Sequence, residues 1–152
     1  MINYMKLVEF YRDYNLIESG LNDQELCAYF IALDHRHNLI IELDWEHDII
    51  GFIELWRITY EQLGRIMVHG LIDARAEDTS SGSICFLANL AIHPSHRGDK
   101  SLDRLLRNRF FKENYGCEYF CGDSRRRIHH HTFNIYKRSE IMSKFLTEVS
   151  NG

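Results

Sequence analysis

The first third of the chain shows apolar residues at helical spacing. One set predicts an amphipathic helix over residues about 4–17, which Ser19-Gly20 ends. Its apolar positions are Tyr4, Leu7, Val8 and Tyr11. Asn22, with Glu25 three residues later, predicts a capping box at the start of a second helix. The apolar face of this second helix holds Leu26, Tyr29, Phe30 and Leu33.

Apolar runs in the middle of the chain predict β-strands. Residues 38–43 and 49–58 are apolar, and the polar residues 44–48 between them predict an antiparallel hairpin. Residues 83–92 are strongly apolar and predict a central strand.

The stretch between the hairpin and the central strand has a mixed pattern. Some of its residues fit one helical face, but Gly64 and Gly70 weaken a helix, and the polar residues 73–81 predict a loop. The residues on that face are Leu63, Ile66, Met67 and Leu71.

The last third continues with a turn, a helix, a strand and a helix. Residues 93–99 hold Pro94 and Gly98 and predict the turn, and Gly116 is expected to end the next helix in the left-handed conformation. The apolar face of that helix holds Leu102, Leu105, Leu106 and Phe110. Residues 117–121 predict a strand and residues about 124–138 a helix. The packing residues of this last helix are Ile128, Phe133, Ile135 and Tyr136. The predicted order is ααββ(α)βαβα, which is an α/β class.

Length and composition favour one globular domain over residues 1–152. The chain has 152 residues, of which 45% are hydrophobic and 26% are charged. No apolar run approaches the roughly 20 residues that cross a bilayer, and the first residues lack the order of a signal peptide. We therefore expect a cytoplasmic protein without membrane partners. Its four cysteines lie in apolar segments and are expected to be reduced: Cys27, Cys85, Cys117 and Cys121.

Charge is distributed unevenly behind the net charge of −4. Residues 1–92 hold 6 Lys and Arg against 15 Asp and Glu, whereas residues 93–138 hold 11 against 5. This asymmetry predicts an anion site built mainly from the second segment, although basic helix faces that only meet solvent would show the same pattern.

The strand, turn and helix after residue 83 carry the most informative motif. Its centre reads Leu90-Ala91-Ile92-His93-Pro94-Ser95-His96-Arg97-Gly98. This segment resembles the acyl-CoA-binding segment of the GNAT superfamily of N-acyltransferases. A pyrophosphate needs free backbone N–H groups and a helix N-terminus directed at it, and small turn residues allow close approach.

The resemblance implies a GNAT-like fold, with a mixed, mostly antiparallel sheet flanked by helices, and acetyl-CoA or another acyl-CoA as the acyl donor. The backbone from Asn89 to Ile92 would pair with the pantetheine amides. The expected cofactor-binding residues are Leu90, Ala91, Ile92, Arg97, Gly98, Asp99, Lys100, Ser101 and Arg125.

The catalytic residues expected from this resemblance and from proton chemistry are Tyr136 and Glu54. Tyr136 occupies the position at which many GNAT members place a tyrosine that protonates the CoA thiolate. A general base must take a proton from the acceptor ammonium, and Glu54 on the long strand is one candidate. His93 at the end of the central strand is the other.

Three departures from the family pattern keep a second interpretation open. Lys100 and Leu102 replace glycines of the phosphate turn, and Phe86 stands where some members place a glutamate base. The resemblance implies direct transfer of an acyl group, with acetyl expected, to a primary amine on a small molecule or protein. The alternative is a GNAT-fold protein without catalysis that binds a protein or nucleic acid.

The remaining candidates for binding are Arg125-Arg126-Arg127 and the neighbouring histidines. The arginines, expected to open the last helix, would bind the 3′-phosphate of CoA or the phosphates of RNA. His129-His130-His131 on a helix would point in different directions, so we expect no metal site. No motif in the sequence indicates the acceptor, the length of the acyl group or the oligomeric state.

Overall fold

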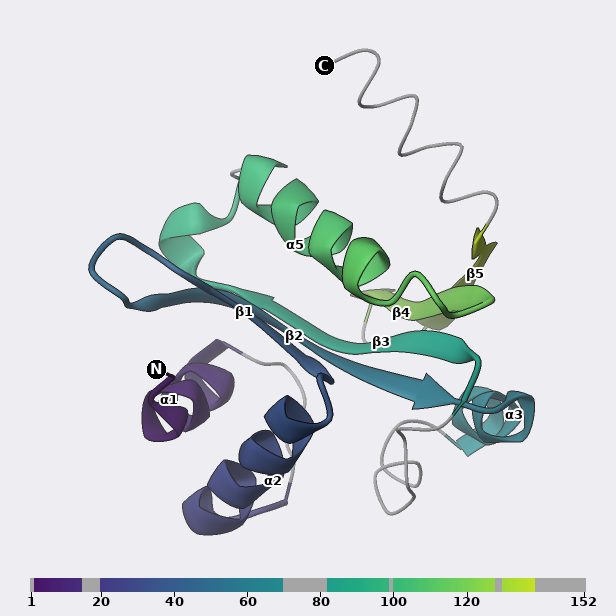
Figure 1. Cartoon of the computed structure of the whole chain (residues 1–152), viewed down its shortest axis with the longest axis horizontal. Coiled ribbons are helices and arrows are strands. Elements are labelled where there is room, and N and C mark those ends of the chain that lie inside the picture. Colours follow the sequence, from purple (N-terminus) through teal and green to yellow (C-terminus); the bar gives the residue numbers. More distant parts are fainter. Residues whose placement is uncertain (1, 15–19, 70–81, 99, 128–129, 139–152) are drawn as a thin grey trace. The chain divides into compact units, whose positions relative to one another are not determined.

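A five-stranded sheet organises the computed structural model, with strand order β1-β2-β3-β4-β5 (Figure 1). The structure describes residues 2–14, 20–69, 82–98, 100–127 and 130–138. The helices are α1 (Tyr4–Tyr14), α2 (Asp23–His35), α3 (Tyr60–His69) and α5 (Lys100–Glu113), with a short 3₁₀ helix η1 (Pro94–His96). The strands are β1 (Leu39–Leu43), β2 (Ile49–Ile58), β3 (Ile84–Ile92), β4 (Tyr119–Arg127) and β5 (His130–Lys137).

The sheet is mixed and mostly antiparallel, as expected. β1 pairs antiparallel with β2, β3 pairs parallel with β4, and β4 pairs antiparallel with β5. The N–H of His93 donates to the carbonyl of Ile50 and the N–H of Gly82 to the carbonyl of Arg57. The end of β3 therefore lies beside the start of β2, and the start of β3 beside the end of β2. β2 and β3 are also antiparallel.

The chain forms two compact units. Unit 1 comprises Met1–Leu55 and Asn89–Phe110, and unit 2 comprises Trp56–Ala88 and Phe111–Gly152. The prediction of one domain over the whole chain stays a prediction, and each unit is described by itself below.

In unit 1, α1 and α2 cover one face of the strands and α5 the other (Figure 1). Phe52 of β2 makes edge contacts with Phe10 of α1 and Phe30 of α2, whose ring centroids lie 5.9 and 6.2 Å away. On the opposite face, a Cβ added to Gly51 would lie 2.9 Å from Leu106 of α5. The glycine therefore lets α5 pack closely on the hairpin.

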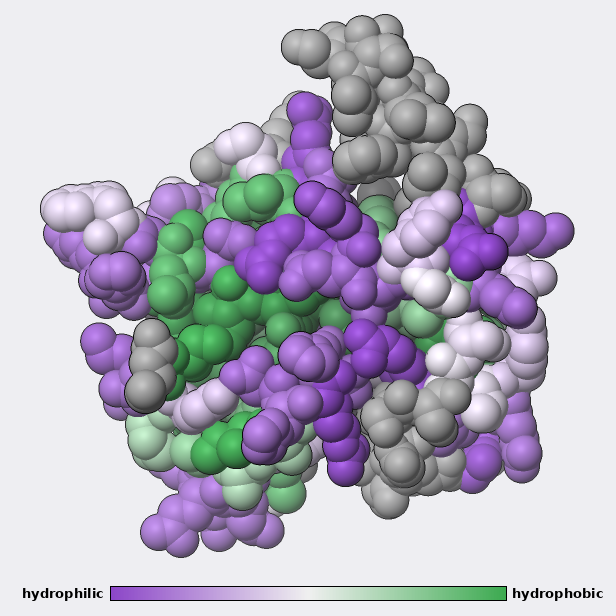
Figure 2. Space-filling model, in the orientation of Figure 1, coloured by the Kyte–Doolittle hydropathy of each residue, from purple (hydrophilic) through white to green (hydrophobic). Residues whose placement is uncertain are grey.

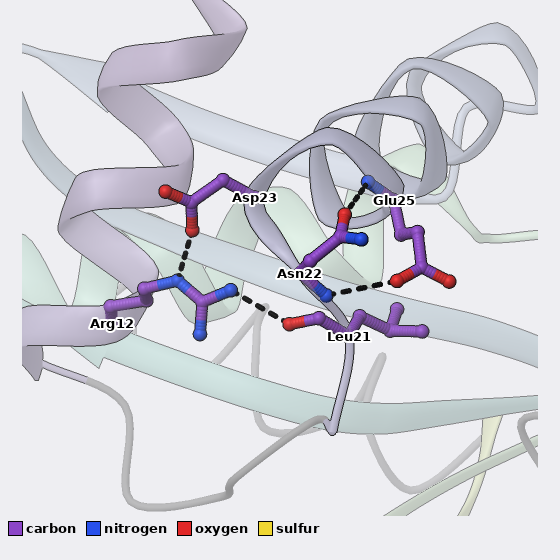
Figure 3. A network of polar contacts seen from close by, with 5 residues as sticks. All are labelled: Arg12, Leu21, Asn22, Asp23 and Glu25. Atoms are coloured by element: carbon purple, nitrogen blue, oxygen red, sulfur yellow. Dashed lines mark hydrogen bonds and ion pairs between the residues drawn. The ribbon is translucent and has the colours of Figure 1, made fainter.

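The predicted capping box is present at the start of α2, and Arg12 of α1 contacts the same region (Figure 3). The Asn22 side chain accepts from the Glu25 N–H at 2.8 Å, and the Glu25 side chain accepts from the Asn22 N–H at 3.1 Å. Arg12 donates to Asp23 at 2.5 Å and to the Leu21 carbonyl at 2.7 Å. This short-range pattern of sequence was sufficient to predict the helix start.

The edge strand β1 is shielded by an ion pair. Arg109 of α5 donates to the Ile41 carbonyl at 3.0 Å and to Glu42 at 2.5 Å. Figure 2 shows apolar surface along the hairpin beside the hydrophilic side chains of α5. A paired charge on an edge strand disfavours the addition of a further strand.

In unit 2, the prediction of a helix over residues 124–138 is wrong. β4 continues to Arg127, and β5 returns antiparallel to it, with Phe120 opposite Tyr136 and Cys121 opposite Ile135. Pairing with β4 satisfies the backbone of a segment rich in Thr, Phe, Ile and Tyr, which favour strands over helices. Arg125 therefore lies on a strand, and the argument from a helix N-terminus does not apply to it.

Three smaller predictions are also wrong. Met67 of α3 is 49% exposed, whereas Leu63 and Ile66 on the same helix are buried. Gly116 has no positive φ, and it lies in a turn that the N–H of Cys117 closes onto the carbonyl of Asn114 at 3.0 Å. The predicted packing position Leu105 is 46% exposed. Leu71 and the end of the first helix at residue 17 fall outside the described residues.

The described cysteines are all free thiols, and three of the four are buried. Within the described ranges, no helix combines the length and the apolar character that crossing a membrane requires.

Candidate functional site

The end of β3 leads into α5 through a tight, exposed turn in unit 1. η1 follows β3 after His93, whose side chain accepts from the Ser95 N–H and caps it. Gly98 then adopts φ +93°, a conformation that favours glycine, and a Cβ there would meet no atom within 4 Å. The open turn and the following helix start are the two features that a phosphate site requires.

Two residues of β3 direct backbone groups away from β2. His93 donates its N–H to β2, and neighbouring residues in an antiparallel ladder alternate in direction. The N–H and C=O groups of Ile92 and Leu90 therefore point away from β2, while those of Ala91 point toward it. The side chains of Leu90 and Ile92 are half-buried.

Arg97 folds back over the end of β3. Its Nε donates to the carbonyl of Ile92 at 3.1 Å, and the residue is exposed. Ser101, in the first turn of α5, is also exposed. The structure thus brings a cation, the strand end and the helix start together at one place.

The side chains that replace family glycines differ in their placement. Leu102 is 6% exposed and packs into the core, so it does not fill the turn. Lys100 begins α5, and its side chain is outside the described part, as is Asp99. Leu102 therefore has a packing role. The sequence alone could not show whether its side chain packs inward or blocks the phosphate turn.

The predicted residues of unit 2 lie on strands. Tyr136 is on β5 and Arg125 is on β4, and neither side chain is among those described. The family position assigned to Tyr136 assumed a helix, so its proposed role now has a weaker basis in the sequence. Phe86 is fully buried and stacks on Trp56.

Glu54 lies in a buried cluster with Tyr29 and Asn89, which we call the Glu54 cluster. Glu54 is 0% exposed. It accepts a short hydrogen bond from the Tyr29 hydroxyl of α2 and a 2.7 Å bond from the Asn89 amide of β3. A buried carboxylate needs such donors, because leaving it without them is costly. The sequence pattern predicted only a packing role for Tyr29, although a hydroxyl on an apolar helix face indicates a polar partner.

Tyr14, His93 and Ser95 form a second group, the His93 cluster. The Ser95 N–H lies 3.1 Å and its Oγ 2.7 Å from His93 Nδ1, while Tyr14 Oη lies 3.4 Å from Nε2. A backbone N–H can only donate, so Nδ1 is an acceptor. A neutral His93 therefore carries its proton on Nε2, directed at Tyr14.

Unit 2 contains a buried thiol pair beside an arginine. Arg57 donates to the Asn114 carboxamide at 3.2 and 2.8 Å. A hydrogen bond from Cys85, helped by the positive charge of Arg57, lowers the pKa of Cys117 to about 7. Burial raises the pKa of Cys85 far above its usual range. These opposite shifts make Cys117 the acidic member of the pair.

No three His, Cys, Asp or Glu side chains of the described ranges gather in a way that could hold a metal ion. The expectation of no metal stays a prediction, since His129 lies outside those ranges.

Solved structures share this arrangement of helices and strands. GphF, a GNAT-like decarboxylase in complex with isobutyryl-CoA, matches 80% of the chain with a TM-score of 0.62 and 19% identity. A GNAT-superfamily phosphinothricin acetyltransferase from Sinorhizobium meliloti, in complex with acetyl-CoA, matches 79% with a TM-score of 0.53 and 12% identity. The loading GNATL domain of CurA from Lyngbya majuscula matches 80% with a TM-score of 0.54 and 20% identity.

The chain has the GNAT fold. The GNAT-like fold that the sequence motif implied is therefore confirmed. The chain spans 61%, 60% and 59% of these three neighbours, about three fifths of their length. No protein-family model matches it, and no curated protein matches it in sequence. Because sequence identity to these structures is low, they define the architecture of this chain, and its activity has to be argued from its own residues.

Proposed function

We propose that this chain transfers an acyl group from acyl-CoA to a primary amine. The observation that carries the proposal is the open turn from the end of β3 to the start of α5, on a fold whose solved neighbours include complexes with acetyl-CoA and isobutyryl-CoA. That turn places Arg97 and Gly98 ahead of a helix N-terminus. Such a terminus stabilises an anion through its unpaired N–H groups and its dipole.

In this proposal the turn holds the pyrophosphate and β3 holds the pantetheine arm. The backbone N–H groups at the start of α5, with Ser101 and Lys100, surround the phosphates, and Arg97 adds a charge-assisted contact. Leu90 and Ile92 pair with the pantetheine amides, because their backbone groups point away from β2.

The chemical step is direct attack of the amine nitrogen on the thioester carbonyl. A new C–N bond forms as the carbonyl oxygen takes up negative charge, which strand N–H groups stabilise. The C–S bond then breaks and the C=O bond re-forms. The nitrogen gives up one proton to the base and one to solvent, and the CoA thiolate takes one proton from solvent. Amide, CoA thiol and one released proton result.

Between the two candidate bases, the contacts favour Glu54. A carboxylate offers several acceptor lone pairs, and two partners of Glu54 donate to it, the Tyr29 hydroxyl and the Asn89 amide. His93 uses Nδ1 to cap η1, and its Nε2 carries the proton. Accepting another proton would therefore require His93 to release the cap.

Acyl-CoA binding tests the cofactor part of this proposal. Acetyl-CoA or isobutyryl-CoA at a hundred times its dissociation constant should stabilise the chain by about 2.7 kcal/mol, measured as a rise in Tm. Arg97→Ala should weaken binding about tenfold in calorimetry, since a charge-assisted contact is lost. Lys112→Ala, which removes a cation at the other end of α5, is the matched control.

The outcomes separate clearly. Binding that Arg97→Ala weakens and Lys112→Ala leaves unchanged supports the turn as the phosphate site. Equal weakening by both variants would indicate general charge attraction instead. No Tm rise with either ligand at millimolar concentration overturns the acyltransferase proposal and leaves a fold that acts by binding another partner.

A further inference from the structure

We propose that the turn between β1 and β2 binds α5 of a second copy of this chain. We call residues 44–48 the hairpin tip. In this contact, Trp45 of one copy packs on Leu105 and Arg104 of the other. The contact is independent of the proposed reaction, because it involves neither the Glu54 cluster nor the turn before α5.

The first observation is the exposure of the tip. Trp45 is the most exposed large hydrophobic side chain of the described residues, at 87%. Leu43, just before the tip, is 36% exposed. Figure 1 shows the tip projecting past α1 at one end of the hairpin. Burying an aromatic side chain removes a large apolar area from water, so a partner that covers Trp45 gains binding free energy.

The second observation is the fixed shape of the tip, which hydrogen bonds to Asp44 hold in place. Oδ1 of Asp44 accepts from the N–H groups of Glu46 and Asp48, both at 2.9 Å. The Asp44 N–H donates to the Asp48 carbonyl at 2.9 Å, and the Asp44 carbonyl accepts from the His47 N–H at 3.0 Å. An aromatic residue on such a turn loses little freedom on binding, and tryptophan is enriched among the residues that dominate interfaces.

The third observation is the charge of the tip. Trp45 lies between Asp44 and Glu46, and Asp48 follows two residues later. Asp48 forms an exposed ion pair with Lys6 at 4.0 Å, whereas Glu46 has no ion pair in the part of the chain that the structure describes. The tip therefore suits a partner surface that combines an apolar residue with a cation.

A surface that matches the tip lies on the outer side of α5. Leu105 is 46% exposed, and Arg104 beside it is also exposed. Arg107 pairs with Asp103 of the same helix at 3.0 Å, whereas Arg104 forms no ion pair within the described ranges. A guanidinium can stack on an indole ring and pair with a neighbouring carboxylate, and leucine supplies an apolar contact.

Both surfaces belong to one chain and carry opposite charge. Residues 1–92, which include the tip, hold an excess of Asp and Glu, and residues 93–138, which include α5, hold an excess of Lys and Arg. A two-fold arrangement makes the contact twice, because each copy gives its tip to α5 of the other. A second copy therefore covers both Trp45 and Leu105, whereas a basic peptide would cover Trp45 alone.

Sedimentation equilibrium of the whole chain measures the dissociation constant of the dimer. Trp45→Ala should raise this constant about 30-fold or more, which is the loss expected for an interface tryptophan. Val68→Ala is the matched control, because Val68 is 76% exposed but lies on α3. This control should leave the constant unchanged.

A charge exchange tests which two surfaces meet. Glu46→Arg and Arg104→Glu should each weaken the dimer about tenfold, because each places like charges at the contact. An equimolar mixture of the two variants should recover the wild-type affinity, since the tip of each variant then meets an α5 of opposite charge.

The proposal is supported if Trp45→Ala weakens the dimer, Val68→Ala does not, and the mixed variants recover it. A wild type that stays monomeric at millimolar concentration overturns it. Equal dissociation constants for Trp45→Ala and Val68→Ala, or no recovery in the mixture, also overturn it, because the dimer then forms through other surfaces. A monomer whose tip binds an arginine-rich peptide assigns the tip to a basic protein and overturns the proposal as well.

Discussion

The Glu54 cluster and the His93 cluster lie on the same face of the unit 1 strands, and each joins a helix tyrosine to a candidate base. Tyr29 of α2 donates to Glu54, whereas Tyr14 of α1 lies 3.4 Å from His93 Nε2. The carboxylate can only accept, so both of its observed partners are donors. The imidazole must divide its two nitrogens between accepting from Ser95 and donating to Tyr14.

This difference teaches that acceptor capacity, more than intrinsic basicity, separates the two candidates. From residue type alone, His93 is the more usual general base at neutral pH. Its Nδ1 is engaged in holding the turn that leads to α5, so protonating it would remove a cap. We therefore propose that His93 holds the shape of the phosphate turn and that Glu54 takes the proton.

The largest expected effect comes from Glu54→Gln. We expect acyl transfer to a primary amine to fall by about 100-fold or more, because the proton acceptor is lost. The free energy of unfolding should also fall by about 2 kcal/mol, since the glutamine amide has to face a donor in a buried site. Stopped-flow thiol release and urea denaturation measure the two quantities.

The double variant Glu54→Gln with Asn89→Asp is the control for this change. It restores a donor and acceptor match between the two strands while moving the charge to β3. Stability should recover and transfer should not. Recovery of both would show that the charge acts from either strand, and the distinction between the clusters would lose its basis.

The second effect concerns His93→Ala, which should raise the Kd for acetyl-CoA about tenfold and change kcat little. The lost cap loosens the turn, and losing an N-cap costs about 1 kcal/mol. His93→Asn keeps an oxygen that can accept from the Ser95 N–H, so it should restore binding. A His93→Asn variant with normal binding and a kcat as low as that of Glu54→Gln would identify His93 as the base.

The smallest effect belongs to Tyr14→Phe. The 3.4 Å contact with His93 is long, and its loss should change the free energy of unfolding by less than about 0.5 kcal/mol. The transfer rate should stay within about twofold of the wild type. A loss comparable to that of Glu54→Gln would assign the proton transfer to the His93 cluster instead.

Much of unit 1 could be predicted from short-range pattern. The hairpin, the capping box at Asn22 and the strand before Pro94 were expected, and each depends on residues close together in sequence. The backbone direction of Leu90 and Ile92 could not be, because it depends on pairing with β2. The helix predicted over residues 124–138 was wrong because pairing with β4 and the strand preference of Thr, Phe, Ile and Tyr both favour a strand there.

The sequence by itself determined where the helices of unit 1 start, which strand precedes the turn, and that Arg97 and Gly98 follow it. These features arise from local spacing, capping and turn chemistry, which act over a few residues. Only the tertiary structure decided that Glu54 is buried against Tyr29 and Asn89, that Leu102 packs inward, and that residues 130–137 form a strand. Burial and cross-strand pairing join residues far apart in the chain, and no local pattern records them.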